Sequence, residues 1–196
     1  MKLSYLSIFL FSSASTAAVN RTATNGWGST PAQRHYIDAA QAGQAIQAAV
    51  AYSDANGLAN NIAIYDPSSR LVAFLRMDNA YLGSVDISMK KAQTVTYFNG
   101  LFPSYGLYNR SKPAGDLWGI EETNGGLVVF GGGQPIYDDD GYFIGAIGVS
   151  GGTVTQDVDT AVAGAQAVGS TLTDYTVDWT SCEAVGCCAP YCSNHL

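Results

Sequence analysis

The chain has few charged residues and few histidines. Of its 196 residues 13% are charged and two are histidine, and sixteen acidic against nine basic residues give a net charge of −7. A nucleic-acid-binding surface needs a basic footprint, and so does a surface that binds anionic lipids. The charge balance therefore argues against nucleic acid and against a membrane surface as partners.

The sequence also lacks the short motifs that identify a reaction. We find no Ser-His-Asp set and no cluster of metal ligands, and Gly131–Gly133 is not followed by the Gly-Lys-Ser/Thr of a phosphate-binding loop. After the first twenty residues, no apolar run approaches the roughly 20 residues that a membrane helix needs. We therefore predict no bound metal ion.

The first eighteen residues have the pattern of a secretory signal peptide. Lys2 provides a positive start, Leu3–Phe11 form a short apolar core, and Ala17 or Ala18 offers a cleavage point. The alternative is an apolar start with no targeting role. The pattern predicts a secreted protein that begins near residue 19.

All four cysteines lie in one short C-terminal tail, at Cys182, Cys187, Cys188 and Cys192. An even, clustered set in a secreted protein is typical of disulfide bonds, although a bond between the adjacent pair would be strained. A zinc site is the alternative, but its paired Cys-x₂₋₄-Cys arms are absent. We expect a signal peptide (1–18), a linker (19–34), one domain (35–170) and a cysteine-rich tail (171–196).

Between these ends, residue periodicity predicts three helices and several strands. Apolar residues at helical spacing predict helices over 39–55, 85–96 and 153–169. Alternation and turn residues predict a hairpin of 62–64 and 71–77, and further strands over 127–130, 134–137 and 142–149. The order favours an α+β fold in which three helices pack on a meandering antiparallel sheet.

Two segments carry a family resemblance. Arg76–Phe98 reads RMDNAYLGSVDISMKKAQTVTYF, and Gly125–Asp157 reads GGLVVFGGGQPIYDDDGYFIGAIGVSGGTVTQD. Together they resemble the GlcG/HbpS-like family of haem-binding or haem-degrading domains, over about residues 36–169. The resemblance implies a profilin-like α-β-α sandwich and a possible haem cofactor. Sequons at Asn20 and Asn109 would fit a glycoprotein, hence a secreted, eukaryotic-type member.

The resemblance points to three charged candidates. The triplet Arg76-Met77-Asp78 matches the family's Arg-Met-Asp, and Lys91-Ala92 matches its Lys-Ala. Asp78 would serve as a polar anchor or general base, with Arg76 binding a carboxylate and Lys91 a second anion contact or proton carrier. The alternatives are a charged pair that fixes a strand end and a solvated lysine.

A glycine-rich turn runs from Gly148 to Thr153 into the last predicted helix. Unpaired N–H groups and the positive end of the helix dipole suit a small carboxylate there, bound at Ser150, Gly151 and Gly152. Alternatively, the glycines only permit a tight turn, and Ser150 or Thr153 caps the helix.

An aromatic connection follows the second predicted helix. It contains Tyr97, Phe98, Phe102, Tyr105, Tyr108 and Trp118. We expect it to wall a ligand pocket near the glycine turn, with Tyr105 and Trp118 as contacts, or else to form a subunit interface. Haem iron usually takes His, Cys, Met or Tyr, and His35 is the candidate ligand, since His195 belongs to the tail.

Three functions fit these patterns. The first is a secreted small-molecule-binding protein that takes haem or another flat hydrophobic ligand. The second is a metal-independent isomerase or cyclase acting on a small aromatic or secondary-metabolite substrate, with Asp78 or Lys91 moving a proton. The third is a structural oligomer. Low charge and many small residues favour a homo-oligomer in each case.

Overall fold

The computed structural model describes residues 19–173. Its main elements are α1 (Ala39–Ala55), β1 (Asn61–Tyr65), β2 (Leu71–Arg76), α2 (Ser84–Tyr97), β3 (Gly133–Tyr137), β4 (Phe143–Ser150) and α3 (Val154–Gln166). Four short 3₁₀ turns accompany them: η1 (Thr22–Thr24), η2 (Pro31–Gln33), η3 (Ser104–Leu107) and η4 (Ile120–Glu122). In this part of the chain no helix has the length and apolar character needed to span a bilayer. The predicted signal peptide, the four cysteines and His195 lie outside the described residues.

The four strands form one antiparallel sheet in the order β2-β1-β4-β3. The predicted antiparallel sheet is confirmed, but the predicted meander is wrong, because β1 pairs with β4 and α2 carries the chain from one edge of the sheet to the other. The register aligns Arg76, Asn61 and Ser150 in one row across three strands. The row brings the Arg-Met-Asp segment and the glycine turn to the same end of the sheet.

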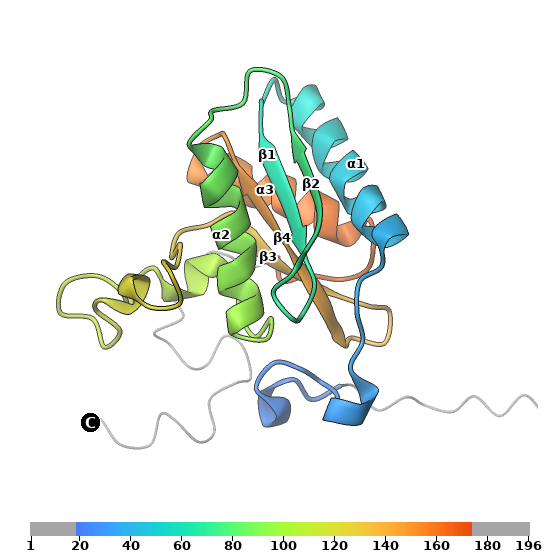
Figure 1. Ribbon diagram of the computed structural model, residues 1–196, viewed down its shortest axis with the longest axis vertical. Coiled ribbons are helices and arrows are strands. Elements are labelled where there is room, and N and C mark those ends of the chain that lie inside the picture. The colour runs from blue at the N-terminus through green and yellow to red at the C-terminus, as the bar shows by residue number, and fades with distance from the viewer. Residues whose placement is uncertain (1–18, 174–196) are drawn as a thin grey trace, which may run out of the picture.

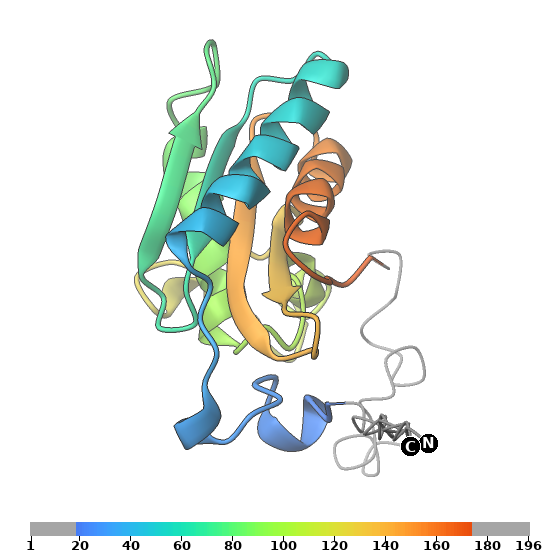
Figure 2. The ribbon, with the colours of Figure 1, turned by 90° about the vertical axis from the view of Figure 1, so that its right-hand side faces the viewer.

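Helices cover both faces of this sheet. Figure 2 shows α1 and α3 side by side on one face, and α2 lies on the other face (Figure 1). Ile62 and Ile147 pack in the core beneath α1 and α3, whereas Ala63 and Ala146 pack beneath α2. Alternate residues of a strand point to opposite faces, so one sheet serves both cores. The α-β-α sandwich is confirmed.

Two helices begin at capping boxes that the sequence encodes. The Asp38 side chain accepts a hydrogen bond from the Gln41 N–H and opens α1, and Thr153 does the same with Gln156 at α3. Each glutamine side chain in turn accepts a hydrogen bond from the backbone N–H of its cap. Thr153 thus fills the capping role that was one of the two interpretations of the glycine turn.

Residues 127–130, predicted as a strand, do not form one; only Gly133–Tyr137 joins the sheet here. Ser104 explains part of the difference, because its hydroxyl donates to the Phe130 carbonyl and accepts from the Gly133 N–H. These bonds tie the segment to η3 rather than to a neighbouring strand.

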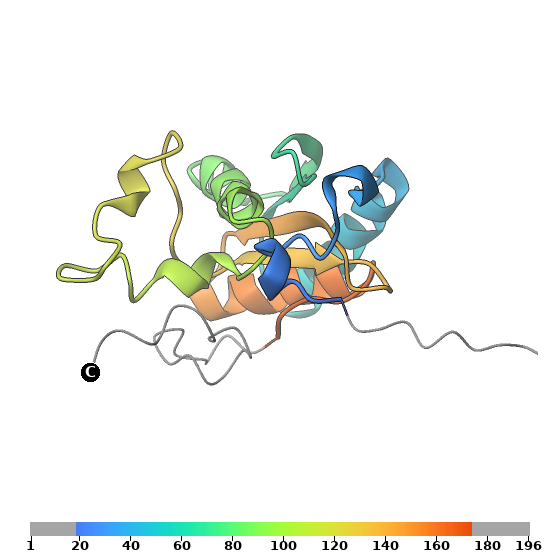
Figure 3. The same cartoon turned by 90° about the horizontal axis from the view of Figure 1, so that it is seen from below.

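Residues 19–34, predicted as a linker, form a short arm that packs beneath one end of the sheet (Figure 3). Trp27 contacts Phe143 edge-on, with ring centroids 6.0 Å apart, and the Arg21 guanidinium lies 3.9 Å from the centre of the Tyr137 ring. The arm therefore closes the end of the core that α2 covers.

Candidate functional site

A buried ion pair lies beneath the glycine turn. The Lys91 ammonium on α2 donates to the Asp157 carboxylate on α3 over 2.6 Å and to the Val149 carbonyl over 2.8 Å. The Lys91 side chain has no exposed surface and that of Asp157 is 4% exposed. Lys91 is therefore not a solvated lysine, and it joins three elements of the fold.

The other oxygen of this carboxylate occupies the turn itself. Asp157 Oδ1 accepts from the Gly151 N–H over 3.1 Å and from the Gly152 N–H over 2.9 Å. The anion that we expected from outside is thus the chain's own carboxylate, and the prediction that these N–H groups are unpaired is wrong. The turn's N–H groups therefore already have an anionic partner within the fold.

Burial dominates the titration of both partners. Removal from water lowers the pKa of Lys91 below its ordinary value, and the carboxylate of Asp157 only partly offsets this. Removal from water likewise raises the pKa of Asp157, against the opposing effects of Lys91 and of the two glycine N–H groups. Each shift favours the neutral form, as expected for ionisable groups without solvent.

The row across the sheet end contains an unsatisfied buried acceptor. Asn61 is fully buried, its amide donates to the Tyr81 carbonyl, and its Oδ1 accepts no hydrogen bond from residues 19–173. Asn60, the preceding residue, has a second such oxygen, while its amide donates to Ser53. The polar interior here is therefore only partly satisfied.

Arg76 and Asp78 line an open hollow at the edge of the sheet, and both are exposed. The hollow has a volume of about 540 Å³ and lies between β2 and the end of α1. Within the described part of the chain, Arg76 and Asp78 form no ion pair with each other, so they are not a mutually fixed pair. Lys91 is held by Asp157 instead, and the structure does not bring it together with Asp78.

His35 forms a second polar cluster, at the opposite end of β4. Its Nδ1 lies 2.6 Å from Asp138 Oδ2, and its ring lies 4.3 Å from that of Tyr142. Asp138 Oδ1 in turn accepts from the N–H groups of Asp140 and Tyr142, which fixes the carboxylate. A carboxylate only accepts hydrogen bonds, so Nδ1 is the donor of this bond. In a neutral imidazole with the proton on Nδ1, the lone pair is on Nε2.

The side chains of His35 and Met77 differ in how free they are to bind a further group. The His35 side chain is 37% exposed, and the carboxylate behind it is the orienting partner usual for a metal-bound histidine. The Met77 sulfur, in contrast, accepts a bond from the Asn60 N–H over 3.4 Å. Among residues 19–173, no three His, Cys, Asp or Glu side chains gather in a way that could hold a metal ion by themselves.

Four residues of the aromatic connection pack on one another in pairs. Tyr105 stacks on Tyr108, with ring centroids 5.3 Å apart, and the ring centroids of Phe98 and Phe102 are 5.1 Å apart. Trp118 is 65% exposed. The pocket wall and the subunit interface both stay predictions for this segment.

Residues 37–166 match the protein family described as Haem degrading protein HbpS-like, and this match covers more than half of the chain. The chain belongs to that family. The corrinoid adenosyltransferase PduO of Citrobacter freundii is 34% identical over 101 residues, which make up 51% of this chain and 29% of that enzyme. The chain spans less than two thirds of the length of the curated relatives that it matches.

Solved structures agree with the fold. The Klebsiella pneumoniae protein ORFY is 29% identical, with a TM-score of 0.65 over 71% of this chain and 95% of that one. A PduOC:haem complex is 30% identical, with a TM-score of 0.63 over 68% of this chain and 95% of that one. One similar structure was therefore solved with haem.

Sequence reasoning missed the two carboxylates that organise these clusters. Asp157 follows Thr153 by four residues, so an acid on the first turn of a helix after a glycine turn was a usable signal. Asp138 stands in an Asp-Asp-Asp-Gly turn, and nothing in the sequence shows that residue 35 lies beside it.

Proposed function

We propose that this HbpS-like protein binds haem, with His35 as the iron ligand. The geometry of His35 carries the proposal: Asp138 accepts the Nδ1 hydrogen bond over 2.6 Å, and the side chain is 37% exposed, so that Nε2 would serve as the iron ligand. Family membership and the haem complex of a similar domain support haem as the ligand class. Haem would supply an iron centre that binds a further small molecule or undergoes oxidation and reduction.

The chain's own residues define what His35 does. The Asp138 carboxylate holds the imidazole in one tautomer and makes Nε2 a stronger electron-pair donor to a metal. Tyr142 packs against the ring and fixes its plane. A histidine prepared in this way loses little conformational entropy when it binds a metal.

Hemin titration tests the proposal, and the chain contains its own control. It has two histidines, His35 and His195. We expect saturable binding with a shifted Soret band, lost in His35→Ala and unchanged in His195→Ala. Asp138→Asn should weaken binding by roughly 10- to 100-fold, since outer partners of metal-bound histidines contribute that much.

Two results would show that His35 is not the iron ligand. One is an unchanged Soret spectrum in His35→Ala, and the other is an equal loss of hemin binding in both histidine variants. Unfolding curves of each variant show whether a loss reflects the site or the fold. Hemin added to an unrelated acidic protein measures non-specific adsorption.

We also propose that the protein is exported and that it forms a homo-oligomer. A secreted form with a disulfide-bonded tail rests on the signal-like start and on four cysteines that lie outside the described residues. The glycosylation sites stay predictions, and Asn20 and Asn109 are both exposed. A eukaryotic-type origin likewise stays a prediction.

A further inference from the structure

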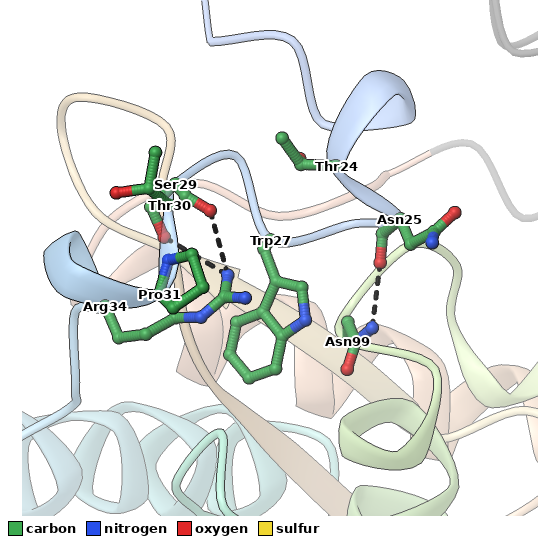
Figure 4. A pocket seen from close by; sticks show the side chains of 8 residues that line it. All are labelled: Thr24, Asn25, Trp27, Ser29, Thr30, Pro31, Arg34 and Asn99. Carbon is green, nitrogen blue, oxygen red and sulfur yellow. Dashed lines mark hydrogen bonds between the residues drawn. The ribbon is translucent and has the colours of Figure 1, made fainter.

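An open hollow of about 470 Å³ lies between the arm and the turn that follows α2. Its wall is made by arm residues between Thr24 and Arg34 and by Asn99 (Figure 4). The family match begins at residue 37, so nearly all of this wall precedes it. None of these residues belongs to the glycine turn, the His35 cluster or the hollow beside Arg76.

Arg34 is held in place at one side of the hollow. Its Nη1 donates to the Ser29 carbonyl over 3.0 Å and to the Ser29 hydroxyl over 3.4 Å. Its guanidinium carbon lies 3.6 Å from the centre of the Trp27 ring. Figure 4 shows the Arg34 and Trp27 side chains next to each other. A stacked guanidinium with one nitrogen fixed is prepared to donate from its remaining N–H groups.

The hollow is positively charged although the protein is acidic. No aspartate or glutamate lines it, and Arg34 takes part in none of the ion pairs within the described part of the chain. All of the hydrogen bonds that the Arg34 guanidinium makes to residues 19–173 come from Nη1. Its Nε and Nη2 groups make no hydrogen bond to these residues, so they can donate to an anion in the hollow.

The opposite wall is rigid. The Asn99 amide donates to the Asn25 carbonyl over 3.0 Å, and the Gly28 N–H donates to the Thr24 hydroxyl over 2.7 Å. A Cβ atom on Gly26 would clash with the Asn99 carbonyl oxygen, so the arm approaches the turn closely. A ligand would therefore meet a wall that is already formed, at a low entropy cost.

We propose that this hollow binds small monocarboxylates with a flat apolar body, such as aromatic acids. The carboxylate accepts from Nε and Nη2 of Arg34, which present the paired donors that a carboxylate prefers. The apolar body lies against Trp27 and Pro31. The site does not depend on His35, whose ring packs on Tyr142 instead.

Benzoate and benzamide, which have nearly the same shape and differ in charge, test the proposal on the wild-type chain. We expect calorimetric titration to show saturable benzoate binding, with benzamide at least about tenfold weaker, because a charge-assisted pair of bonds is lost. The indole N–H signal of Trp27, assigned with Trp27→Phe, should shift with benzoate. Acetate should bind more weakly than benzoate, because it lacks the ring.

Arg34→Gln should weaken benzoate binding by at least about tenfold. Arg70→Gln, which removes an exposed arginine from the β1–β2 turn, should leave binding unchanged. Equal affinity for benzoate and benzamide, or benzoate binding that survives Arg34→Gln, would overturn the proposal. The proposal would also be overturned if sulfate and acetate competed as strongly as benzoate, because the hollow would then be a general anion site. The benzamide comparison needs no variant, so it decides even where Arg34→Gln unfolds.

Discussion

At the scale of single residues, the charge of Lys91 is tolerated because Asp157 lies 2.6 Å away and both are almost fully buried. Removing one partner of such a pair leaves an isolated charge in a site without water, which costs far more than the pair contributes. The backbone also holds both side chains in place. The Val149 carbonyl accepts from Lys91, and the N–H groups of Gly151 and Gly152 donate to Asp157.

A double-mutant cycle on this pair should be strongly non-additive. We expect Lys91→Met and Asp157→Asn each to lower the free energy of unfolding by about 3–5 kcal/mol. The double variant should lose only about 1–2 kcal/mol, since no lone charge remains and the asparagine oxygen still accepts from the glycine N–H groups. Urea unfolding of the four proteins measures the coupling.

The two pKa shifts show that burial is the larger effect on each group taken singly. Loss of water raises the pKa of Asp157 and lowers that of Lys91, although each partner opposes the shift of the other. Additive losses in the two single variants would contradict this account, because they would show that neither charge depends on the other.

The identity of Lys91 as a special residue was predictable from the sequence, but its partner was not. The Lys-Ala resemblance marked position 91, whereas the pairing depends on α2 and α3 lying on opposite faces and meeting at the end of β4. No local pattern encodes a contact between residues 66 positions apart. For the same reason His35 could be proposed as a ligand while Asp138 could not.

At the scale of elements, glycines show where helices pack closely. A Cβ atom added to Gly43 of α1 would have nothing within 4 Å, whereas one on Gly164 of α3 would lie 2.9 Å from the Ala45 carbonyl oxygen and 3.2 Å from the Ala49 Cβ. Both glycines are inside helices, so both have the same low helix propensity. Only their surroundings differ.

Alanine at these two glycines should therefore have opposite effects. Gly43→Ala should raise the free energy of unfolding by about 0.5–1 kcal/mol, because alanine loses less backbone entropy in a helix. Gly164→Ala should lower it by about 1–3 kcal/mol, because α1 and α3 must move apart. Chemical unfolding measures both changes, and a stabilised Gly164→Ala protein would mean that the helices are not in close contact.

The sequence predicted elements better than it predicted their arrangement. The helix over 39–55 was recognisable from its apolar spacing and from Asn56-Gly57, and the hairpin from Asp66–Ser69. The pairing of β1 with β4 was not, because a meander satisfies the same local signals. The segment 127–130 was apolar enough for a strand, but Ser104 holds its end away from the sheet.

At the scale of the whole molecule, the surface has apolar side chains that a monomer leaves exposed. Tyr81 and Leu82, in the loop between β2 and α2, are 71% and 76% exposed, and Trp118 is 65% exposed. Within the described residues β2 is also an edge strand of the sheet, and its Leu71 is exposed. Such edges and apolar groups favour association with another chain.

The proposed homo-oligomer should therefore weaken when this surface is made polar. We expect the chain to sediment as a dimer or larger species, and Leu82→Asp to raise its dissociation constant by at least about tenfold, because a buried, unpaired carboxylate costs more than about 1.4 kcal/mol. Ala51→Asp, at an exposed position of α1, adds the same charge and should leave the association unchanged. Analytical ultracentrifugation over a range of concentrations measures both. A wild type that stays monomeric at high concentration would contradict the homo-oligomer. Equal weakening by both variants would show that added negative charge, and not this surface, controls the association.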